Sequence, residues 1–547
     1  MKKYLPYILF FLLAAWVAAG PVIRRDMTRD KRYTLSAATT GILDSVRQPM
    51  EIEVYLQGEF PSYFRKLAEE TRTLLDQFSA RNPYIHYKFI NPQKNDLGER
   101  LEKEGMKPAE ITVRKNNALR QLRIYPWARL NYGNKKVNVP LLVSLPGKPV
   151  EEQIDRSIEN LEYAFSSAVY NLTQTHKPSI AVLKGHGEWD DLHLAGLLTA
   201  LHDNYRLAPF TLDSLRTGPA RTLAQLQRYD MVLLAGPTKA FSDTAKYALD
   251  QYILNGGKML MAVDPVHAYK DTLMKAGKTY ALHAGLNLTD WLFFYGVRLN
   301  PVLVKDLVAA PVVLKTGEVA GNPQLEPFPW YYSPLAFPNR RHPTGKNVGK
   351  VKLDFASDID TIKAIPLKKT VILHSSPYTQ TVGVPLQINF SEIGSEPDKR
   401  RYNDGIKIFG VLVEGNFRSA YADRIKPFAV TRHRDTGRSK IAVIADGDIV
   451  RNDVAGGRPL PLGYDKWSRM QYDNETFIKN VIAYLLDKAG LLKLKNKEFH
   501  IPLLDKNKVI AQGKTWAALN TLGPVLFWLL VGLAVYYRRK QKFARRV

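Results

Sequence analysis

Seven polar side chains follow three segments that the sequence predicts to be buried strands. They are His186, Glu188 and Asp190 after the first segment, Asp264 after the second, and Asp446, Asp448 and Asp453 after the third. In open parallel sheets, ligands bind beyond the carboxyl ends of the strands. If these groups converge, their oxygens and imidazole would suit a divalent metal ion, and a metal-dependent hydrolase becomes one hypothesis.

Two plainer interpretations of the same residues stay open. Asp and Gly after a strand are ordinary turn and N-cap residues, and the Asp446-Gly447-Asp448 segment lacks the remaining ligands of a calcium loop. The groups could also recognise a ligand or partner without catalysis. We therefore assign no catalytic residue, no metal ligand and no cofactor. The candidates for ligand or partner binding are His186, Glu188, Asp190, Asp264, Asp446 and Asp448.

Several other chemistries are excluded by the sequence. With no cysteine, the chain has no disulfide, thiolate zinc site or cysteine nucleophile. Gly277–Thr279 and Gly513–Thr515 match the end of a phosphate-binding G-x-x-x-x-G-K-[ST] loop, but Thr272 and Lys508 replace its first glycine. The G-x-S-x-G pentapeptide of serine hydrolases does not occur. The chain is therefore not expected to be an ATPase or such a hydrolase.

The length and composition are those of a globular protein with more than one domain. The chain has 547 residues, of which 45% are hydrophobic, so two or three domains are expected. The formal net charge is +26, yet Lys and Arg are spread along the chain without one basic arm. This spread favours a solvated surface over nucleic-acid binding.

Each end of the chain carries a hydrophobic segment long enough to cross a bilayer. Tyr4–Ile23 and Thr515–Tyr537 lack charged side chains, and residues 538–547 hold six Lys or Arg. By the positive-inside rule this tail is cytoplasmic, so two spans place both termini in the cytoplasm and the rest outside it. Cleavage of the first segment as a signal peptide, near Ala18–Gly20, is the alternative.

The region after the first span predicts a small α/β domain over residues 34–148. A short helix capped by Ser36 or Thr34 precedes a strand at 50–56, a helix at 63–80 and a strand at 85–90. Short alternating runs follow between residues 108 and 143. This β-α-β unit followed by a hairpin-like sheet predicts a thioredoxin-like domain, which without a C-x-x-C motif serves as scaffold or interaction surface.

The region from 150 to 490 predicts a larger, doubly wound domain. A helix at 151–175 precedes apolar strands at 179–184, 229–236 and 258–265 that alternate with helices, a pattern typical of a parallel sheet covered on both faces. Residues 300–439 are proline-rich with short strands and predict a β-rich insertion. A further strand at 439–450 and a helix at 475–486 complete the domain, and residues 491–514 form a basic linker to the second span.

Several blocks in this order resemble the GldG family of gliding-motility proteins of Bacteroidetes. They are DKRYTLSAAT, EIEVYLQGEFPSYFRKL, GHGE at 185–188, YDMVLLAGPTKAFSD at 229–243, DQYILNGGKMLMAVDP at 250–265 and ADGDIVRND at 445–453. No single block is diagnostic, but their order and spacing together are specific. The resemblance covers nearly the whole chain, including both terminal spans.

The resemblance implies a non-enzymatic, substrate-binding or auxiliary subunit of an ABC transporter. Its expected partners are a multi-span permease, a cytoplasmic ATPase reached through that permease, and envelope motility or secretion machinery. The location implied is the inner membrane, with the large domain in the periplasm. The larger domain would be similar to the glutamine-amidotransferase fold, but the missing cysteine excludes glutaminase activity. A structural envelope scaffold without an ABC partner remains an alternative.

Overall fold

The structure is a computed structural model that describes residues 34–94, 96–115, 118–143, 149–174, 176–319, 322–393, 396–487, 490–496 and 506–544. The predicted first span, Tyr4–Ile23, lies outside these residues. The chain divides into two compact units, one containing residues 31–497 and the other residues 498–547. Each unit is described by itself below.

The first unit begins with a four-stranded sheet of order β2-β1-β5-β6. Ser36 caps α2 (Ala37–Leu43) by accepting a hydrogen bond from the Thr39 N–H, as predicted. The predicted β-α-β unit is confirmed, because α3 (Ser62–Arg81) connects the parallel strands β1 (Met50–Val54) and β2 (Ile85–Phe89). The other elements of this region are α4 (Leu97–Lys103), the hairpin β3 (Ala109–Lys115) and β4 (Ala118–Ile124), and the antiparallel pair β5 (Trp127–Tyr132) and β6 (Lys135–Pro140).

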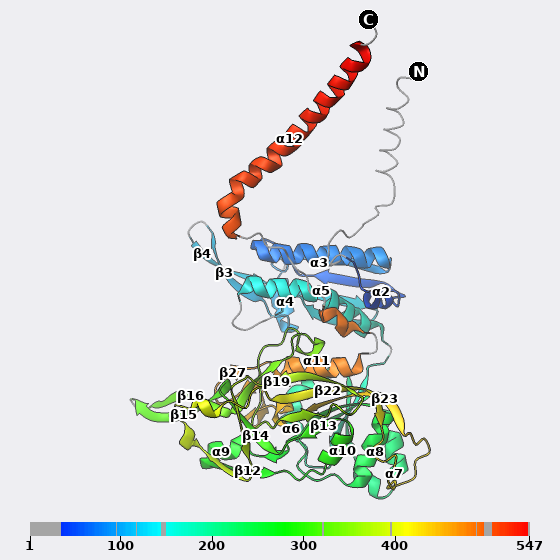
Figure 1. Ribbon diagram of the computed structural model, residues 1–547, viewed down its shortest axis with the longest axis vertical. Helices are drawn as coiled ribbons and strands as arrows, with labels where there is room; N and C mark the ends of the chain where they lie inside the picture. Colours follow the sequence, from blue (N-terminus) through cyan, green and yellow to red (C-terminus); the bar gives the residue numbers. More distant parts are fainter. Residues whose placement is uncertain are drawn as a thin grey trace. The chain divides into compact units, whose positions relative to one another are not determined.

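The long helix α5 (Val150–Thr173) belongs to the core of this first sheet. Its residues Ile154, Phe165 and Val169 are buried in one apolar cluster with β1 and α3. Leu491 and Leu494 from the far end of the chain join the same cluster. In Figure 1, α3 and α5 run along the sheet, and the two helices contact each other.

The second sheet is built around five parallel strands in the order β8-β7-β9-β10-β23. They are β8 (Arg206–Thr211), β7 (Ser179–Lys184), β9 (Met231–Ala235), β10 (Lys258–Ala262) and β23 (Thr436–Ile444). Successive residues of β9 face opposite sides: Val232 packs with α7 (Pro219–Leu226) and α8 (Asp243–Leu254), and Leu233 packs with α6 (Asp191–His202) and α11 (Asn474–Leu486). The predicted parallel sheet with both faces covered is confirmed.

The predicted β-rich insertion at 300–439 contains many strands, and part of it extends this same sheet. Strand β22 (Ile408–Arg418) pairs antiparallel with β23, and β19 (Lys368–His374), β16 (Asn322–Pro338) and β15 (Ala309–Val319) follow in order. Apolar residues of β19 and β22, among them Ile372 and Leu412, share a core with the parallel strands. The alternating, proline-rich pattern therefore marks antiparallel strands that extend the sheet rather than a separate body.

Shorter elements surround this sheet. They are β11 (Val266–His267), α9 (Lys270–Ala276), β12 (Lys278–His283), α10 (Thr289–Phe294), β13 (Val297–Leu299), β14 (Val302–Asp306), β17 (Val351–Lys352), β18 (Ile359–Thr361), β20 (Thr379–Gly383), β21 (Leu386–Asn389), β24 (Val454–Ala455), β25 (Arg458–Pro459), β26 (Tyr464–Asp465) and β27 (Met470–Gln471).

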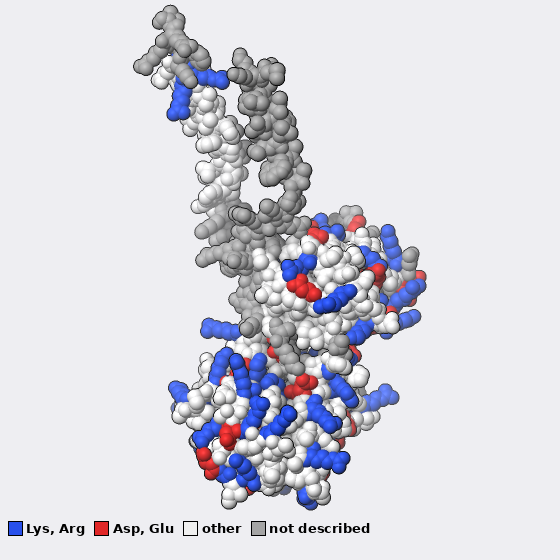
Figure 2. Space-filling model, turned by 90° about the vertical axis from the view of Figure 1, so that its right-hand side faces the viewer, with Lys and Arg blue, Asp and Glu red and all other residues white. Residues whose placement is uncertain are grey.

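Figure 2 shows Lys and Arg spread over the visible face of the first unit, with Asp and Glu among them. On this face the basic residues do not concentrate in one groove.

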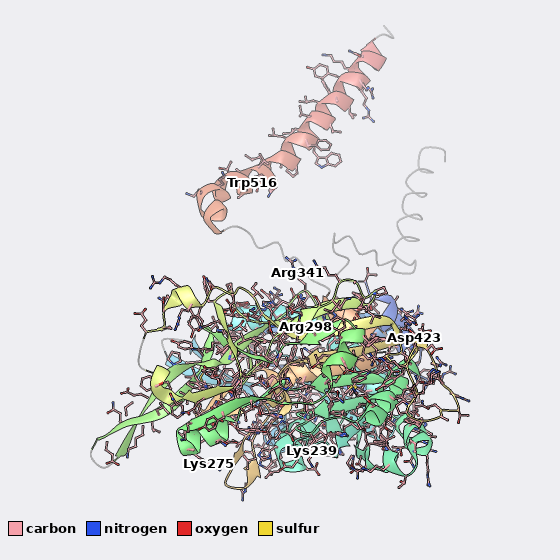
Figure 3. All side chains as sticks on the ribbon, turned by 60° about the horizontal axis from the view of Figure 1, so that its bottom comes forward. Lys239, Lys275, Arg298, Arg341, Asp423 and Trp516 are labelled. Atoms are coloured by element: carbon pink, nitrogen blue, oxygen red, sulfur yellow. The ribbon has the colours of Figure 1, made fainter. Side chains whose placement is uncertain are left out.

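The second unit contains the long helix α12 (Lys506–Ala544). Its segment Ala511–Gln541 is long and apolar enough to cross a membrane, and among the described residues no other helix meets that description. The segment includes the predicted second span, and its large apolar side chains, such as Trp516 (Figure 3) and Trp528, are exposed. The basic linker predicted over residues 491–514 overlaps this helix, since α12 already begins at Lys506.

Candidate functional site

Three of the predicted site residues, Asp264, Asp446 and Asp448, come together at the carboxyl ends of β10 and β23. The Asp264 Oδ1 accepts a hydrogen bond of 2.7 Å from the Gly447 N–H, which joins the two strand ends directly. Asp446 is fully buried, and its two oxygens accept hydrogen bonds of 2.9 Å from the Ile449 and Asp354 N–H groups. The convergence expected from parallel strand order is therefore present for these carboxyl groups.

Close backbone approach holds these strand ends together. A Cβ atom on Gly447 would overlap the Asp264 carboxylate and lie 2.9 Å from the Gly236 Cα at the end of β9. Trp189, in the turn after β7, donates its indole N–H to the Gly447 carbonyl at 3.0 Å and its backbone N–H to the Ala235 carbonyl at 3.1 Å. Four neighbouring strand ends are thus tied into one structure.

Arg451 is the cation nearest to this carboxyl cluster. Its guanidinium forms ion pairs with Asp448, at 3.3 Å, and with Asp271 of α9. It also lies over the Trp189 ring, 4.6 Å from the centroid, in a cation–π contact. Lys466 pairs with the other oxygen of Asp271 at 2.9 Å. The arrangement fixes the Arg451 side chain between two carboxylates and an aromatic face.

A second ionic group lies next to the first. Lys270 binds Asp465 at 2.9 Å and Lys352 binds Asp465 at 3.1 Å, and both lysines also pair with Asp354. The Lys270 and Asp465 side chains are nearly fully buried, so each charge depends on its partner. The Asp354 N–H that binds Asp446 connects this group to the strand ends. This group therefore supports the site rather than offering a free charge.

The pKa values of the carboxyl groups in this region are shifted in opposite directions. Burial, reinforced by the nearby Asp448, raises the pKa of Asp264 to about 8. Burial likewise raises the pKa of Asp446 well above its usual value, with Asp264 and Asp448 adding to the shift. The pKa of Asp271 is lowered to about 2, because Lys466 and Arg451 outweigh its burial. At neutral pH Asp264 accordingly holds a proton, whereas Asp271 stays ionised.

The space inside this cluster is small. A cavity of about 30 Å³ is bounded by Lys352, Asp354, Asp448, Arg451 and neighbouring residues, which is room for about one water molecule. Among the residues that the structure describes, no three His, Asp or Glu side chains are grouped so that they could hold a metal ion. The geometry therefore suits a rigid polar junction better than a metal centre.

His186 and Glu188 form a separate arrangement in the turn after β7. The Glu188 carboxylate is fully buried and accepts the His186 N–H at 2.7 Å, while its other oxygen lies 3.8 Å from the His186 Nδ1. That oxygen and the Nδ1 are both buried without a hydrogen-bond partner. The imidazole stacks on Phe241 at 3.9 Å, and burial lowers its pKa. His186 is thus a neutral, tightly packed ring.

The loop after β9 closes over this turn. The His186 carbonyl accepts hydrogen bonds from the Thr238 and Lys239 N–H groups at 2.9 and 2.8 Å. Gly187 adopts a φ of +73°, and a Cβ there would overlap the Thr238 side chain. The Gly185-His186-Gly187-Glu188 sequence is therefore required by the turn itself, because this conformation and this contact favour glycine.

Asp190 has a local structural role. It is the N-cap of α6, and its carboxylate accepts hydrogen bonds from the His193 backbone N–H at 2.9 Å and contacts the His193 Nδ1 at 2.7 Å. These bonds lower its pKa. Asp453, the remaining polar residue after β23, accepts the Lys466 N–H at 2.9 Å. Asp190 is therefore a cap residue, whereas Asp453 binds a backbone N–H thirteen residues further along the chain.

Sequence reasoning missed the residues that neutralise the cluster. Arg451, Asp271, Lys352 and Asp465 come from segments that no strand pattern connects with Asp264. Arg451 had a signal, since it stands three residues after Asp448 in the ADGDIVRND block. The others had none, because long-range ion pairs leave no periodic pattern.

Comparisons with known proteins place this region in a recognised family. Residues 177–481, more than half of the chain, match the family described as an ABC-type uncharacterized transport system. Residues 29–131 match a second family, described as a domain of unknown function. An uncharacterized protein of Borreliella burgdorferi is 22% identical over 535 residues, which cover 95% of this chain and 94% of that protein.

Solved structures resemble only part of the chain. The N-terminal domain of mmIFT52 is 11% identical with a TM-score of 0.32, covering 56% of this chain and 97% of that one. A thua-like protein from Parabacteroides merdae is 10% identical with a TM-score of 0.30, covering 57% of this chain and 91% of that one. These likenesses are too low to carry a functional argument.

Proposed function

This chain belongs to the ABC-type uncharacterized transport system family, and from that membership we propose that it is a non-enzymatic accessory subunit of an ABC-type membrane complex. The observation that carries the proposal is the family match over residues 177–481, which include the parallel sheet and the polar strand ends. The partners in the proposal are a multi-span permease and, through it, a cytoplasmic ATPase.

The helix α12 supports a membrane location for this subunit. An exposed helix whose 23-residue segment Thr515–Tyr537 carries no charged side chain finds a suitable environment in a bilayer core of about 30 Å. The basic residues after Tyr537 favour a cytoplasmic C-terminus. In our proposal Tyr4–Ile23 also spans the inner membrane, and the first unit acts outside the cytoplasm, in the periplasm.

The polar strand ends support binding or positioning rather than catalysis. Asp446 is buried, Asp264 and Asp448 are partly buried, and all three carboxylates are engaged by backbone N–H groups or by Arg451, so they are not poised to activate a water molecule. A metal-dependent hydrolase is not favoured by this geometry. The finer proposal, a role like that of the GldG gliding-motility proteins, rests on the order of the sequence blocks quoted above.

Affinity purification of the full-length tagged protein in mild detergent tests the proposal. We expect a multi-span permease and an ATPase with Walker motifs to co-purify in a fixed ratio. A chain ending at Lys497, which lacks α12, is the matched control and should recover less of the permease, because tethering raises the local concentration of a membrane partner. Absence of both proteins in several detergents would contradict the accessory-subunit role.

A further inference from the structure

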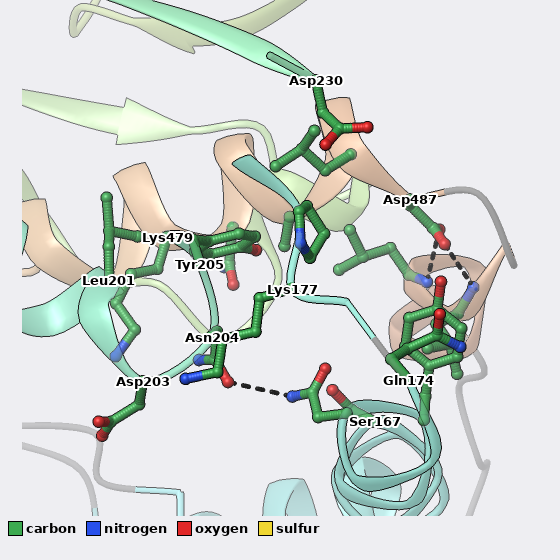
Figure 4. A pocket seen from close by; sticks show the side chains of 18 of the residues that line it. Ser167, Gln174, Lys177, Leu201, Asp203, Asn204, Tyr205, Asp230, Lys479 and Asp487 are labelled. Carbon is green, nitrogen blue, oxygen red and sulfur yellow. Dashed lines mark hydrogen bonds between the residues drawn. The ribbon is translucent and has the colours of Figure 1, made fainter. Parts of the chain in front are cut away.

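A cavity of about 520 Å³ lies at the amino ends of the parallel strands, between α5, α6, α11 and η6 (Leu491–Asn496). Figure 4 shows that its walls carry charges of both signs, among them Lys177, Asp203 and Asp487, and that backbone N–H groups of η6 bind Asp487. Such a lining favours no single class of ligand. The carboxyl ends of the strands, where open parallel sheets bind their ligands, differ in this respect.

A small antiparallel sheet of order β11-β12-β21 extends from the carboxyl end of β10. Its inner face is apolar and buried, because Ala281 and Ile388 belong to one core cluster with the buried side of α9. Side chains alternate along a strand, so Lys278, Tyr280 and Leu282 of β12 all lie on the opposite, outer face. No strand or helix of the described residues pairs with β12 on that face, and all three side chains are exposed.

The outer face carries a row of large apolar side chains in solvent. Tyr280 is 52% exposed and Leu282 is 51% exposed. Leu282 is opposite His267 in the strand register, and the His267 ring stacks on the exposed Tyr269 ring with the centroids 6.2 Å apart. Neighbouring apolar groups in solvent, bordered by polar groups, are typical of a surface that binds a partner.

Three exposed lysines accompany this row. Lys278 stands at the start of β12, Lys275 precedes it at the end of α9, and Lys239 lies in the loop after β9. A hydrogen bond of 2.9 Å from the Phe241 N–H to the Leu286 carbonyl joins this loop to the segment after β12. In Figure 3, Lys239 and Lys275 lie toward the same edge of the first unit. Positive charge is thus present at both ends of β12.

The charge of these lysines is not neutralised within the part of the chain that the structure describes. None of the three has an ion-pair partner there. The acidic residue nearest to Lys275 and Lys278 along the chain is Asp271, which is bound instead by Arg451 and Lys466. The outer face therefore attracts negative charge at its ends and offers apolar contacts between them.

The spacing along β12 indicates the shape of the partner. Lys278, Tyr280 and Leu282 recur at every second residue, which places them about 6.6–6.8 Å apart. Side chains on one side of any extended polypeptide have the same spacing, so an extended segment can oppose each of them in turn.

We propose that this outer face binds an extended, acidic segment of a partner protein. Its carboxylates lie opposite the lysines, and its apolar side chains lie against Tyr280 and Leu282. The proposal goes beyond the accessory-subunit role and does not depend on a permease or an ATPase.

Fluorescence anisotropy with the full-length protein in dodecyl maltoside tests this proposal. The probe is a fluorescein-labelled peptide of sequence Glu-Thr-Phe-Thr-Leu-Ser-Glu, whose alternate residues present carboxylate, phenyl, leucyl and carboxylate groups on one side. A peptide with Lys in place of both Glu residues is the contrast. We expect the acidic peptide to bind saturably, at least tenfold more tightly than the basic peptide, and more weakly as the salt concentration rises.

A charge reversal and a matched control locate the binding. Lys275→Glu combined with Lys278→Glu should weaken binding of the acidic peptide at least tenfold and strengthen binding of the basic peptide. Arg216→Glu combined with Arg221→Glu reverses two exposed cations near α7 and should keep the wild-type preference. Tyr280→Ser should weaken binding of the acidic peptide at least threefold, because it removes an apolar contact without changing the charge.

Four outcomes would overturn the proposal. They are equal binding of the two peptides, an equal loss in the Arg216 and Arg221 control, and unchanged binding of the acidic peptide by Tyr280→Ser, which would show attraction by charge alone. The fourth is a dimer in sedimentation velocity that the Lys275 and Lys278 reversal abolishes, since a second copy of this chain would then occupy the face.

Discussion

At the scale of single residues, the junction between β10 and β23 depends on a glycine. Gly447 has an ordinary backbone conformation, so its importance comes from space and not from φ. Its N–H binds Asp264, its carbonyl binds Trp189, and the position of a Cβ is already taken by the Asp264 carboxylate. Any side chain at 447 must push these strand ends apart.

Gly447→Ala should therefore destabilise the protein. We expect a loss of about 1–3 kcal/mol, the usual cost of adding a methyl group to a filled site. Thermal unfolding of the purified protein measures it. Gly41→Ala is the matched control, because nothing lies within 4 Å of a Cβ at this position of α2 and alanine favours a helix. Equal stability of the two variants would contradict the tight junction.

Asp264 makes stability depend on pH. Its pKa of about 8 in the folded protein lies above the value of about 3.9 expected in the unfolded chain, so the folded state holds a proton that unfolding releases between these values. The stability that this group contributes is complete below pH of about 4 and is lost as the pH rises toward 8. Asp264→Asn keeps the oxygen that accepts the Gly447 N–H and cannot ionise.

The stability of Asp264→Asn relative to the wild type should therefore increase from pH of about 5 to about 8, by an amount on the order of a few kcal/mol. Melting curves of both proteins across this range test it. Asp271→Asn is the control of opposite sign: the pKa of Asp271 is about 2, below its unfolded value, so its contribution is present above pH of about 4 and lost in acid. Its effect should stay constant from pH of about 5 to 8. A constant difference for Asp264→Asn as well would refute the raised pKa.

At the scale of elements, α12 has an asymmetric charge. Its uncharged segment Thr515–Tyr537 is followed by residues 538–547, which carry six Lys or Arg. Replacing all six with Gln should weaken or invert the orientation of this span, because positive charge keeps the flanking segment in the cytoplasm. Protease protection of an epitope at the C-terminus, compared between the two proteins in spheroplasts, measures the effect. An unchanged pattern would count against the proposed topology.

The sequence predicted most of the elements because their patterns are local. The cap at Ser36, the period of α5 and the apolar runs of β7, β9 and β10 could all be recognised. It missed β8 and α7, whose short segments lack a continuous apolar run. It also separated β19 and β22 from the main sheet, because strand pairing across many residues is not visible in a local pattern.

The candidate site was likewise predictable only where a local sequence pattern or the order of the parallel strands determines it. Asp264, Asp446 and Asp448 converge because parallel strands bring their carboxyl ends to one edge. His186 and Glu188 lie in the neighbouring turn, where the His186 ring stacks on Phe241 and the His186 N–H donates to the Glu188 carboxylate, and no sequence pattern distinguishes such a packed pair from an exposed one. Their role in binding stays a prediction, as do the thioredoxin-like and amidotransferase-like descriptions and the division at residues 148–150.

At the scale of the whole molecule, the two units differ in what stabilises them. The first unit has continuous apolar cores, whereas no part of the membrane-length segment of α12 is buried within the protein. The first unit should therefore fold without the second. This separation gives a direct test on a shortened chain.

A chain of residues 34–497 should be soluble and should unfold at the same temperature, within about 3 °C, as the full-length protein in detergent. Circular dichroism on heating and sedimentation velocity check stability and monodispersity. Aggregation of the shortened chain, or a much lower melting temperature, would show that α12 contributes to the fold of the first unit.

The order of strands in the large sheet has a consequence for biosynthesis. Strand β10 ends at Ala262, but β23, which pairs with it, begins only at Thr436. At about 5–20 residues per second, synthesis of the intervening chain takes on the order of 10–30 s, during which an apolar strand edge has no partner. The nascent chain thus passes through a long interval in which it is prone to aggregate, and β22 and β23 close it together as one hairpin.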